Sequence, residues 1–318
     1  MPDDTPPPCV RVRVPAKINP FLAVGGIRDD GYHELVTVLQ TVALHDQLEL
    51  AISADHRRLQ HPTSGGRVSV RFTHDAGPTV PAGPDNLVVR AAVLLAEATG
   101  LTVEDGASVR CTMDLAKRIP IAGGMAGGSA DAAAALLGLN ELWGIEVPRP
   151  VLADLAAALG ADVPFCLVGG TALATGTGTG FARVLCRGTF DWVVCTAAEE
   201  LSTPAVYRAW DDHCTPTEVQ PDAVLAAITA GDPEALGAAI YNDLQPAAEV
   251  LLPRLRADRK ALLDAGALGA LVSGSGPTLL ALAADGDEAQ RIAARVAGRF
   301  DRVLVTTAPA GGPVLTAC

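Results

Sequence analysis

The chain is short of lysine, of aromatic residues and of positive charge. Its 318 residues include 24 basic and 36 acidic side chains, which gives a formal net charge of -12, and 4% are aromatic. The average field of such a chain repels duplex nucleic acid and anionic membrane surfaces. Of the basic side chains only Lys17, Lys117 and Lys260 are lysine. Because the chain otherwise uses arginine, each lysine directs attention to what a compact ammonium group can do.

Long apolar runs and paired cysteine motifs are also missing. No apolar run reaches the roughly 18 residues of a membrane span, and the first residues, M-P-D-D-T-P-P-P-C, lack the basic start and apolar stretch of a signal peptide. The seven cysteines lack C-x-x-C spacing, which predicts reduced, buried thiols. His56, His61 and His74 lack metal-ligand spacing. We expect a cytoplasmic protein without a membrane or nucleic-acid partner and without a metal site of its own. The oligomeric state stays open.

Size and patterning predict an α+β protein of two domains. A hydrophobic content of 49% can fill a sizeable core, and the length favours a division into residues 1–185 and 186–318, within about 15 residues either way. Alternation of apolar and polar residues predicts a first strand at 10–14, which Pro15 ends. Helical spacing predicts a helix at 85–99, with Asp85 or Asn86 as its N-cap and Gly100 as its stop. Further strands are expected at 41–52, 67–72, 108–113, 192–196, 270–273, 279–283 and 303–306, and further helices at 129–143, 150–159, 221–229, 233–241 and 288–300.

The most informative segment is a glycine cluster directly before the expected helix at 129–143. Residues 119–135 read I-P-I-A-G-G-M-A-G-G-S-A-D-A-A-A-A. Glycine lets backbone N–H groups approach an anion, and a helix N-terminus adds unpaired N–H groups and a positive dipole end. No G-K-[ST] follows, so this is not a Walker A loop. On glycine content alone, phosphate binding and a tight-packing turn are equally open.

Four further segments carry candidate site residues. Lys17 lies in the apolar segment V-P-A-K-I-N-P-F-L (14–22), where its ammonium could meet a hydroxyl or a phosphoryl group. Asp162 lies in G-A-D-V-P-F (160–165), where a carboxylate could cap a helix or act as a base. The segment R-D-D-G-Y-H-E-L (28–35) reads as an ordinary turn, and V-S-G-S-G-P-T (272–278) as a turn or a phosphate-side loop.

Together these segments resemble the GHMP kinases. The hallmark of that family is a loop of the form P-x-x-x-G-[LM]-[GA]-[GS]-[GS]-[SA] before a helix, and residues 120–130 match it. Segments 15–22, 28–35 and 160–165 are similar to the branch that acts on 4-diphosphocytidyl-2-C-methyl-D-erythritol. The resemblance covers residues 12 to 278. It implies a two-domain fold, with an N-terminal domain similar to domain 2 of ribosomal protein S5 and a ferredoxin-like C-terminal domain.

The resemblance also implies a reaction. ATP, accompanied by Mg²⁺, would phosphorylate the 2-hydroxyl of that small-molecule substrate in the non-mevalonate, methylerythritol phosphate route to isoprenoids. Asp162 would take the hydroxyl proton, and Lys17 would hold the hydroxyl and Asp162 in position. Ser129 would lie near phosphate or magnesium. The residues implied to wrap the ATP phosphates are Pro120, Ile121, Ala122, Gly123, Gly124, Met125, Ala126, Gly127, Gly128, Ser129 and Ala130.

The same resemblance places the two ends of the substrate. Asn19, Tyr32 and His33 would line the cytidine end, with the His33 ring edge and backbone reading cytosine and an aromatic ring stacking on it. A weaker likeness in L-S-T-P-A-V-Y (201–207) adds a second segment to that pocket. The residues implied there are Thr203, Pro204 and Tyr207, and those implied to approach the phosphates from the C-terminal half are Gly274, Ser275 and Gly276.

Two departures from the family pattern concern the nucleotide. The family loop commonly reads G-L-G-G-G-S-S-D, whereas this chain reads G-M-A-G-G-S-A-D, so Ala126 replaces a glycine and Ala130 a serine. Alanine at 126 is harmless only if its φ lies below zero. The rival hypotheses are a GHMP kinase for homoserine, mevalonate or a sugar, which should not need Tyr32 and His33, and an RNA-binding protein, which the net charge disfavours.

Overall fold

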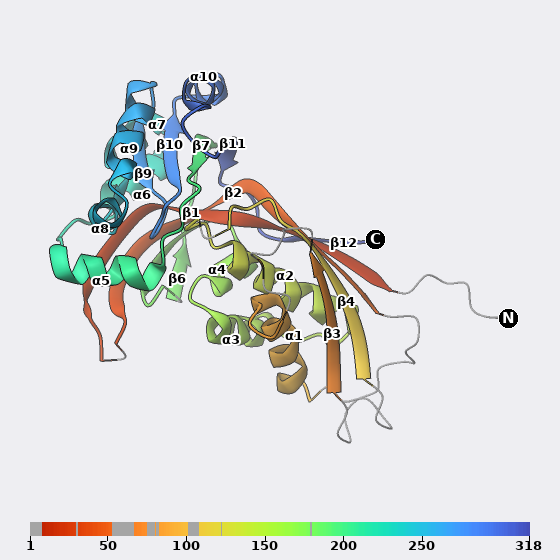
Figure 1. Cartoon of the computed structure of the whole chain (residues 1–318). Helices are drawn as coiled ribbons and strands as arrows, with labels where there is room; N and C mark the ends of the chain where they lie inside the picture. Colours follow the sequence, from red (N-terminus) through yellow and green to blue (C-terminus); the bar gives the residue numbers. More distant parts are fainter. Residues whose placement is uncertain are drawn as a thin grey trace.

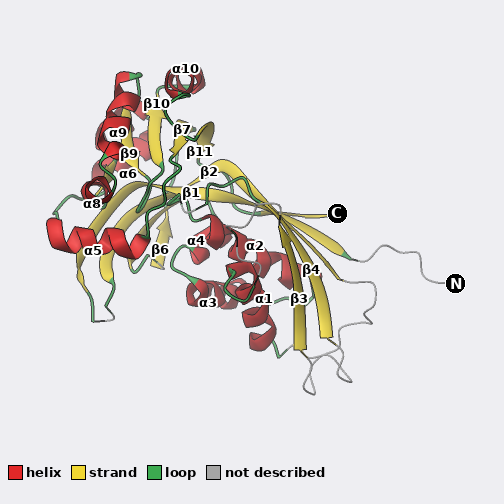
Figure 2. Ribbon diagram, in the orientation of Figure 1, coloured by secondary structure: helices red, strands yellow, loops and turns green. Residues whose placement is uncertain are grey.

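Two sheets organise the chain, and helices pack against both (Figures 1 and 2). The computed structural model describes residues 8–29, 31–52, 67–74, 80, 83–100, 108–121, 123–178 and 180–318, and of 67–74 and 108–110 only the backbone. Helices α1 to α4 lie beside the first sheet, and α6 to α10 surround the second. The α+β class expected from the sequence is confirmed.

The first sheet contains eight strands among the described residues. Its central path runs β12-β1-β2-β4-β3; β5 pairs with β2, β6 with β5, and β8 runs parallel to β1. Most of its pairs are antiparallel, and the last strand of the chain pairs with the first. The bounds are β1 Cys9–Ile27, β2 His33–Ile52, β3 Arg67–His74, β4 Ser108–Ala116, β5 Thr171–Gly176, β6 Gly180–Arg183, β8 Tyr241–Asn242 and β12 Val314–Ala317.

Strand β1 is much longer than the sequence predicts. The expectation that Pro15 ends the strand is wrong, because β1 continues to Ile27 and pairs with β2 along almost its whole length. The pairing register shifts between Pro15 and Ala16. It shifts again between Ile18 and Phe21, the interval that contains Pro20. Proline has no N–H to donate, so strands accommodate it at such irregularities. Lys17 therefore lies inside a strand rather than at its end.

Helix α2 (Gly127–Leu142) packs between the first sheet and its neighbouring helices. Its alanines, at 130 and 132–135, are buried on every side of the helix. A Cβ at Gly138 would lie 2.2 Å from Leu50 Cδ1 and 2.9 Å from Val12 Cγ2, so glycine lets the helix approach the sheet without displacing these two buried side chains. The other helices of this part are α1 Leu87–Ala98, α3 Arg149–Leu159 and α4 Val163–Val168. Helix α1 begins where the sequence predicts, because the Asn86 side chain accepts a 2.8 Å hydrogen bond from Val88 N.

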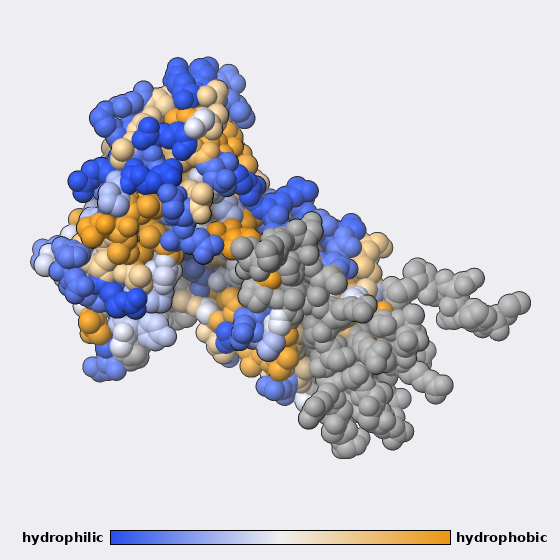
Figure 3. Space-filling model, in the orientation of Figure 1, coloured by the Kyte–Doolittle hydropathy of each residue, from blue (hydrophilic) through white to orange (hydrophobic). Residues whose placement is uncertain are grey.

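The second sheet is antiparallel, in the order β11-β7-β10-β9. Hydrophilic side chains cover α10 in Figure 3, whereas apolar surface gathers over α8, where Val250 and Leu251 are exposed. The strand bounds are β7 Phe190–Thr196, β9 Gly269–Val272, β10 Leu279–Ala283 and β11 Arg302–Ala308; the helix bounds are α5 Thr203–His213, α6 Asp222–Ala230, α7 Pro233–Ala239, α8 Gln245–Leu251, α9 Arg254–Asp264 and α10 Gly286–Val296.

Two cysteines differ from the expectation of seven reduced thiols. Cys9 at the start of β1 and Cys318 after β12 form a disulfide, with their Cα atoms 5.4 Å apart. This pair could not be predicted from local spacing, because its members have a sequence separation of 309. The expectation holds for Cys111, Cys166 and Cys195, which are buried and free, whereas Cys186 and Cys214 are free but only partly buried. Burial raises the pKa of the Cys111 and Cys195 thiols to about 12, so neither is a nucleophile at neutral pH.

Among the described residues no helix is both long and apolar enough to cross a bilayer.

Candidate active site

A cavity of about 620 Å³ opens where the two sheets and their helices meet. Its lining comes from segments far apart in the sequence: β1, the glycine cluster, the loop before α4, the start of α5 and the loop between β9 and β10. The predicted site residues that line it are Lys17, Asn19, Pro120, Ile121, Gly123, Gly124, Ala126, Gly127, Gly128, Asp162, Thr203, Tyr207, Gly274, Ser275 and Gly276. The fold thus brings the two predicted catalytic residues and both predicted loops into one cavity.

Lys17 and Asp162 face each other in this cavity. Lys17 Nζ lies 3.4 Å from Asp162 Oδ2 and donates a 2.8 Å hydrogen bond to Asn19 Oδ1. Asn19 is held in turn, because its Nδ2 donates to Thr37 Oγ1 at 2.8 Å. The Lys17 side chain is 7% exposed and that of Asp162 is 38% exposed. Asp162 directly precedes α4 but makes no side-chain cap there. The Lys17 ammonium group is therefore held in place by Asn19, while the Asp162 carboxylate remains open to a ligand.

The glycine cluster and the loop between β9 and β10 touch each other. Gly124 has φ +70°, and a Cβ there would lie 2.0 Å from Ser273 O. Ser273 Oγ donates a 3.1 Å hydrogen bond to Gly124 O. On the other side of the cluster, Lys17 N donates to Met125 O at 3.2 Å. Glycine at 124 is thus required by both its backbone conformation and its contact, and the cluster is joined to the strand that carries Lys17.

The first turn of α2 forms one end of the cavity. The helix begins at Gly127, and Gly127 and Gly128 line the cavity. Unpaired N–H groups at a helix N-terminus favour phosphate. Ala126 precedes the helix with φ +55°, so the condition under which alanine is harmless there is not met. Met125 and Ala130 are fully buried and support the loop rather than line it. Ala122 lies outside the described residues.

A buried group of three charges beneath the loop was not predicted. Lys117 Nζ forms ion pairs with Asp46 Oδ2 and, at 2.7 Å, with Asp131 Oδ2. Asp46 Oδ1 also accepts the backbone N–H groups of Arg118 at 2.6 Å and Ile119 at 2.9 Å. The three side chains are at most 7% exposed. Asp46 and Lys117 come from distant parts of the chain, and the scarcity of lysine was the only sequence signal that could have suggested the cluster.

Burial controls the protonation of this cluster. It raises the pKa of Asp131 to about 8, and the charge of Asp46 acts in the same direction, while Lys117 opposes them. For Lys117 burial alone would lower the pKa, but the two carboxylates outweigh it and raise the pKa. Ionising both carboxylates beside a single ammonium group, away from water, carries a large free-energy cost. Lys117 and Asp131 also line the cavity, so the protonation state of the cluster affects the charge that a bound ligand meets.

Val80, Asp85, Asn86 and Leu87 extend the cavity beyond the glycine cluster. They come from the segment that leads into α1, and Asn86 is held there by its capping hydrogen bond to Val88 N. The sequence identified Asn86 as a helix cap only. Its position next to the loop could not be read from local spacing, because it depends on how α1 packs against α2.

The predicted substrate segments are only partly inside the cavity. Thr203 and Tyr207 line it, and Thr203 Oγ1 lies 2.8 Å from Ser275 Oγ, which joins α5 to the phosphate-side loop. Tyr32, His33 and Pro204 do not belong to its lining. Tyr32 is 69% exposed, whereas the His33 ring stacks on that of Tyr207 with centroids 5.4 Å apart. His33 is thus joined to the cavity through Tyr207.

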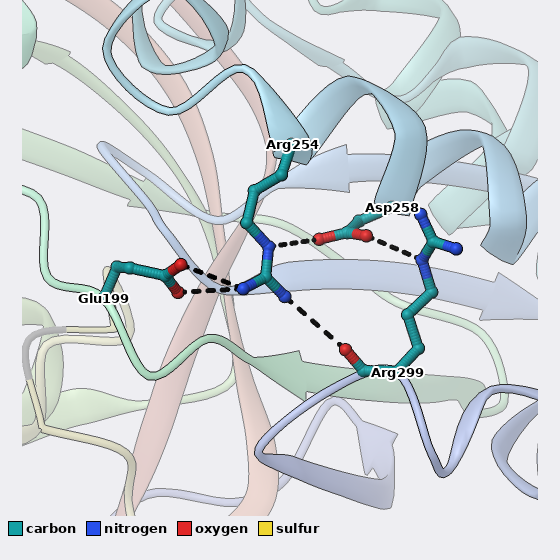
Figure 4. Close-up of polar contacts among 4 residues, drawn as sticks. All are labelled: Glu199, Arg254, Asp258 and Arg299. Carbon is teal, nitrogen blue, oxygen red and sulfur yellow. Dashed lines mark hydrogen bonds and ion pairs between the residues drawn. The ribbon is translucent and has the colours of Figure 1, made fainter.

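A network of ion pairs holds the segment that leads into α5. Arg254 Nη1 donates to both carboxylate oxygens of Glu199, at 2.9 and 3.0 Å, and its Nε donates to Asp258 Oδ2 at 3.0 Å (Figure 4). Asp258 is 5% exposed and accepts a second bond, at 2.6 Å, from Arg299 Nε. The network therefore anchors residue 199 to α9, four positions before Thr203.

Comparison with known proteins agrees with this geometry. The model of the GHMP kinases N terminal domain matches residues 86–170, and that of the GHMP kinases C terminal matches 224–302. The 4-diphosphocytidyl-2-C-methyl-D-erythritol kinase of Mycolicibacterium smegmatis is 45% identical over 311 residues, which cover 96% of this chain and 90% of the relative. The protein of the same name from Streptomyces avermitilis is 45% identical over 309 residues, or 95% and 98% of the two chains.

Solved structures extend the likeness. A crystal structure of 4-(cytidine 5'-diphospho)-2C-methyl-D-erythritol kinase is similar with a TM-score of 0.76 and 34% identity, covering 95% of this chain and 100% of the other. A homoserine kinase from Cytophaga hutchinsonii has a TM-score of 0.74 at 20% identity, covering 99% and 100%, and shares the fold.

The fold and the family matches define an ATP-dependent small-molecule kinase. The two-domain kinase fold expected from the sequence is thereby confirmed. The chain belongs to the GHMP kinases and, within that family, to the 4-diphosphocytidyl-2-C-methyl-D-erythritol kinases.

Proposed function

We propose that the protein transfers the γ-phosphoryl group of ATP to the 2-hydroxyl of 4-diphosphocytidyl-2-C-methyl-D-erythritol. The products are the 2-phosphate and ADP, in the methylerythritol phosphate pathway of isoprenoid biosynthesis. The observation that carries the proposal is the Lys17–Asp162 contact of 3.4 Å in a cavity that the glycine cluster also lines. A base, a cation and an anion-binding loop in one cavity are the parts that phosphoryl transfer requires.

Asp162 and Lys17 divide the work at the hydroxyl. Asp162, with its carboxylate 38% exposed, accepts the proton of the attacking hydroxyl. Lys17, fixed by Asn19, holds that hydroxyl and Asp162 at a set distance and counters the negative charge that develops between them. Phosphoryl transfer depends mainly on positioning and charge neutralisation, so two such groups suffice.

The triphosphate would lie against Gly123 to Gly128 and the N-terminus of α2, with Gly274, Ser275 and Gly276 closing from the other side. Both ammonium groups of the cavity are already paired, Lys17 with Asp162 and Lys117 with Asp46 and Asp131. No arginine is found among the described residues of its lining. The charge on the phosphates therefore calls for another counterion.

Mg²⁺ fits this requirement. It binds substrate phosphates and waters with few protein ligands, and Ser129, a partly buried residue that does not itself line the cavity, lies in the first turn of α2 beside Gly127 and Gly128, which do. When bound, the ion neutralises charge that develops on the transferred group. The protein residues supply the loop that orients the phosphates and the base that receives the proton.

The cytidine end would extend along Asn19, Thr203 and Tyr207 toward His33, with Tyr32 and Pro204 on its outer side. Tyr207 supports this placement, because its ring joins the cavity to His33. We propose the cytoplasm as the location, where ATP is supplied. Nucleic acids and membranes are not expected as partners, since the net charge is -12.

Phosphorus NMR tests the reaction directly. Purified protein with ATP and magnesium is mixed with the cytidylated alcohol in one tube, and with homoserine, mevalonate or galactose in parallel tubes. We expect a new phosphomonoester signal in the first tube alone. A signal only in another tube would keep the kinase class and reject this substrate, and silence in all would reject the proposed reaction.

A further inference from the structure

The His33 ring is held by two oxygen atoms, one from each side. Its Nδ1 lies 3.0 Å from the backbone oxygen of Gly25, and its Nε2 lies 3.2 Å from Asp211 Oδ1. A carbonyl and a carboxylate oxygen can only accept, so each contact is a hydrogen bond when the facing ring nitrogen carries a hydrogen. The His33 side chain is 9% exposed, whereas that of Asp211 is 39% exposed. The ring is therefore enclosed, and Asp211 is the acceptor that stands at the surface.

One face of α5 supplies most of this enclosure. Tyr207 stacks on the His33 ring, Trp210 meets it edge-on with centroids 5.2 Å apart, and Asp211 bonds its Nε2. These three residues are spaced i, i+3 and i+4, so they lie on the same side of the helix. At its other end, α5 carries Thr203, which lines the cavity. The helix thus joins the His33 ring to the substrate end of the cavity.

The residue that α5 contacts here, His33, belongs to the first sheet. His33 opens β2 and pairs across the hairpin with Ile27 of β1. The Asp211–His33 bond therefore ties the tip of the β1–β2 hairpin to α5. A charge-assisted hydrogen bond of this kind fixes the orientation of an imidazole ring more firmly than stacking alone.

We propose that Asp211 is a positioning residue for the pyrimidine end of the substrate. It holds the His33 ring on Tyr207 and thereby sets the wall against which the base docks. This inference rests on the proposed function, in which that wall meets the cytidine end, and adds a residue that neither the family motifs nor the lining of the cavity indicate. Asp211 acts through His33, so its loss should weaken binding of the cytidylated substrate and leave phosphoryl transfer intact.

Steady-state kinetics of Asp211→Asn tests the proposal, because asparagine keeps the shape and removes the charge. We expect KM for 4-diphosphocytidyl-2-C-methyl-D-erythritol to rise about tenfold, with kcat and KM for ATP changed less than about twofold. The neighbouring Asp212→Asn is the matched control, since it removes an exposed carboxylate from the same turn, and it should behave as wild type. Asp211→Glu should restore part of the affinity.

Two further readouts separate positioning from a merely structural role. In protein labelled with ¹⁵N-histidine, the His33 ring signals, assigned with a His33→Gln variant, should shift in Asp211→Asn and stay unchanged in Asp212→Asn. Calorimetric titration with cytidine 5'-diphosphate should show the same loss of affinity, while the melting temperature stays within a few degrees of wild type.

The outcomes distinguish this inference from the proposed function. If wild type turns over the cytidylated substrate and Asp211→Asn matches Asp212→Asn, the inference is wrong and the function stands. Equal rises in KM for both substrates, or a parallel fall in kcat, would reduce Asp211 to a support of α5 and also overturn it. If wild type neither turns over this substrate nor binds cytidine 5'-diphosphate, both the inference and the proposed function are wrong.

Discussion

Lys17 and Lys117 are both buried lysines beside aspartates in the same cavity, yet their surroundings differ. Lys17 is paired with one carboxylate, 3.4 Å away and 38% exposed. Lys117 is paired with two carboxylates that are 0% and 6% exposed, one of which also accepts two backbone N–H groups. The carboxylate of the loose pair is open to the cavity, whereas both carboxylates of the tight cluster are buried.

The comparison teaches that residue type does not separate an ion pair proposed as catalytic from a supporting one. The exposure of the carboxylate does. An aspartate that is open to the cavity can receive a proton from a ligand, whereas an aspartate that is saturated by protein donors can only hold its neighbours. In this chain the supporting cluster fixes residues 118 and 119, immediately before the glycine cluster.

The largest expected effect is on stability, at Lys117. Lys117→Met should lower the free energy of unfolding by about 3 to 5 kcal/mol, because it removes the cation that pairs with the fully buried Asp46 carboxylate. Urea unfolding followed by tryptophan fluorescence measures the loss. Lys260→Met is the control, since its ion pair with Asp264 is exposed, and should cost under about 0.5 kcal/mol. Equal losses in both variants would erase the distinction between the two regions.

The next effect is on turnover, at the open pair. Asp162→Asn and Lys17→Ala should each lower kcat about a hundredfold or more, because the base or its positioning cation is lost. The circular dichroism spectrum of Asp162→Asn should remain that of wild type, since the Asp162 side chain is not buried and caps no helix. Near-normal kcat in both variants would contradict the roles assigned to the pair.

A smaller effect concerns pH. Burial raises the pKa of Asp131 from 3.8 in the unfolded chain to about 8 in the folded protein. Between these values the folded protein keeps a proton that the unfolded chain has released, so the free energy of unfolding falls as pH rises. Relative to Asp131→Asn, wild type should lose up to about 1.4 kcal/mol per pH unit near pH 5, and about half of that near pH 8. Parallel urea-unfolding curves for the two proteins across this range would show that Asp131 is ionised throughout.

The smallest expected effect is on stability, at Ala126 in the glycine cluster. Ala126→Gly should raise the free energy of unfolding by about 0.5 to 1 kcal/mol, because a left-handed alanine costs more than the added freedom of glycine in the unfolded chain. Glu146→Gly is the matched variant, since Glu146 has φ +49° and does not line the cavity. Calorimetric melting should show similar gains, and a loss at 126 alone would mean that the loop depends on the alanine side chain.

Much of the fold follows from local pattern. Five elements lie close to their predicted bounds: helices α1 and α2 and strands β7, β9 and β10. Their burial pattern and capping residues can be recognised in consecutive residues of the sequence. The prediction failed where tertiary pairing decides. Strand β1 passes through two prolines because β2 pairs with it, and β12 is a strand because β1 offers an edge.

The site was predictable to the extent that its residues lie in motifs. Lys17, Asp162 and the two glycine loops were located by short segments, and the fold assembles them. Asp46, Lys117 and Asp211 were missed because their function depends on partners far away in the sequence. The domain boundary near residue 185 stays a prediction. The change of sheet between β6 and β7 supports it, although β8 and β12 return to the first sheet.

The pairing of β12 with β1 has a practical consequence. Cys9 and Cys318 are neighbours at one edge of the first sheet, and neither of these strand ends lies in the lining of the cavity. Strand β12 and the short β8, both of which lie after residue 185, pair with β1 of the first sheet. A fragment that stops near residue 185 would therefore lose two strands of the first sheet and expose unpaired backbone groups of β1, so truncation at that point should not yield a stable half.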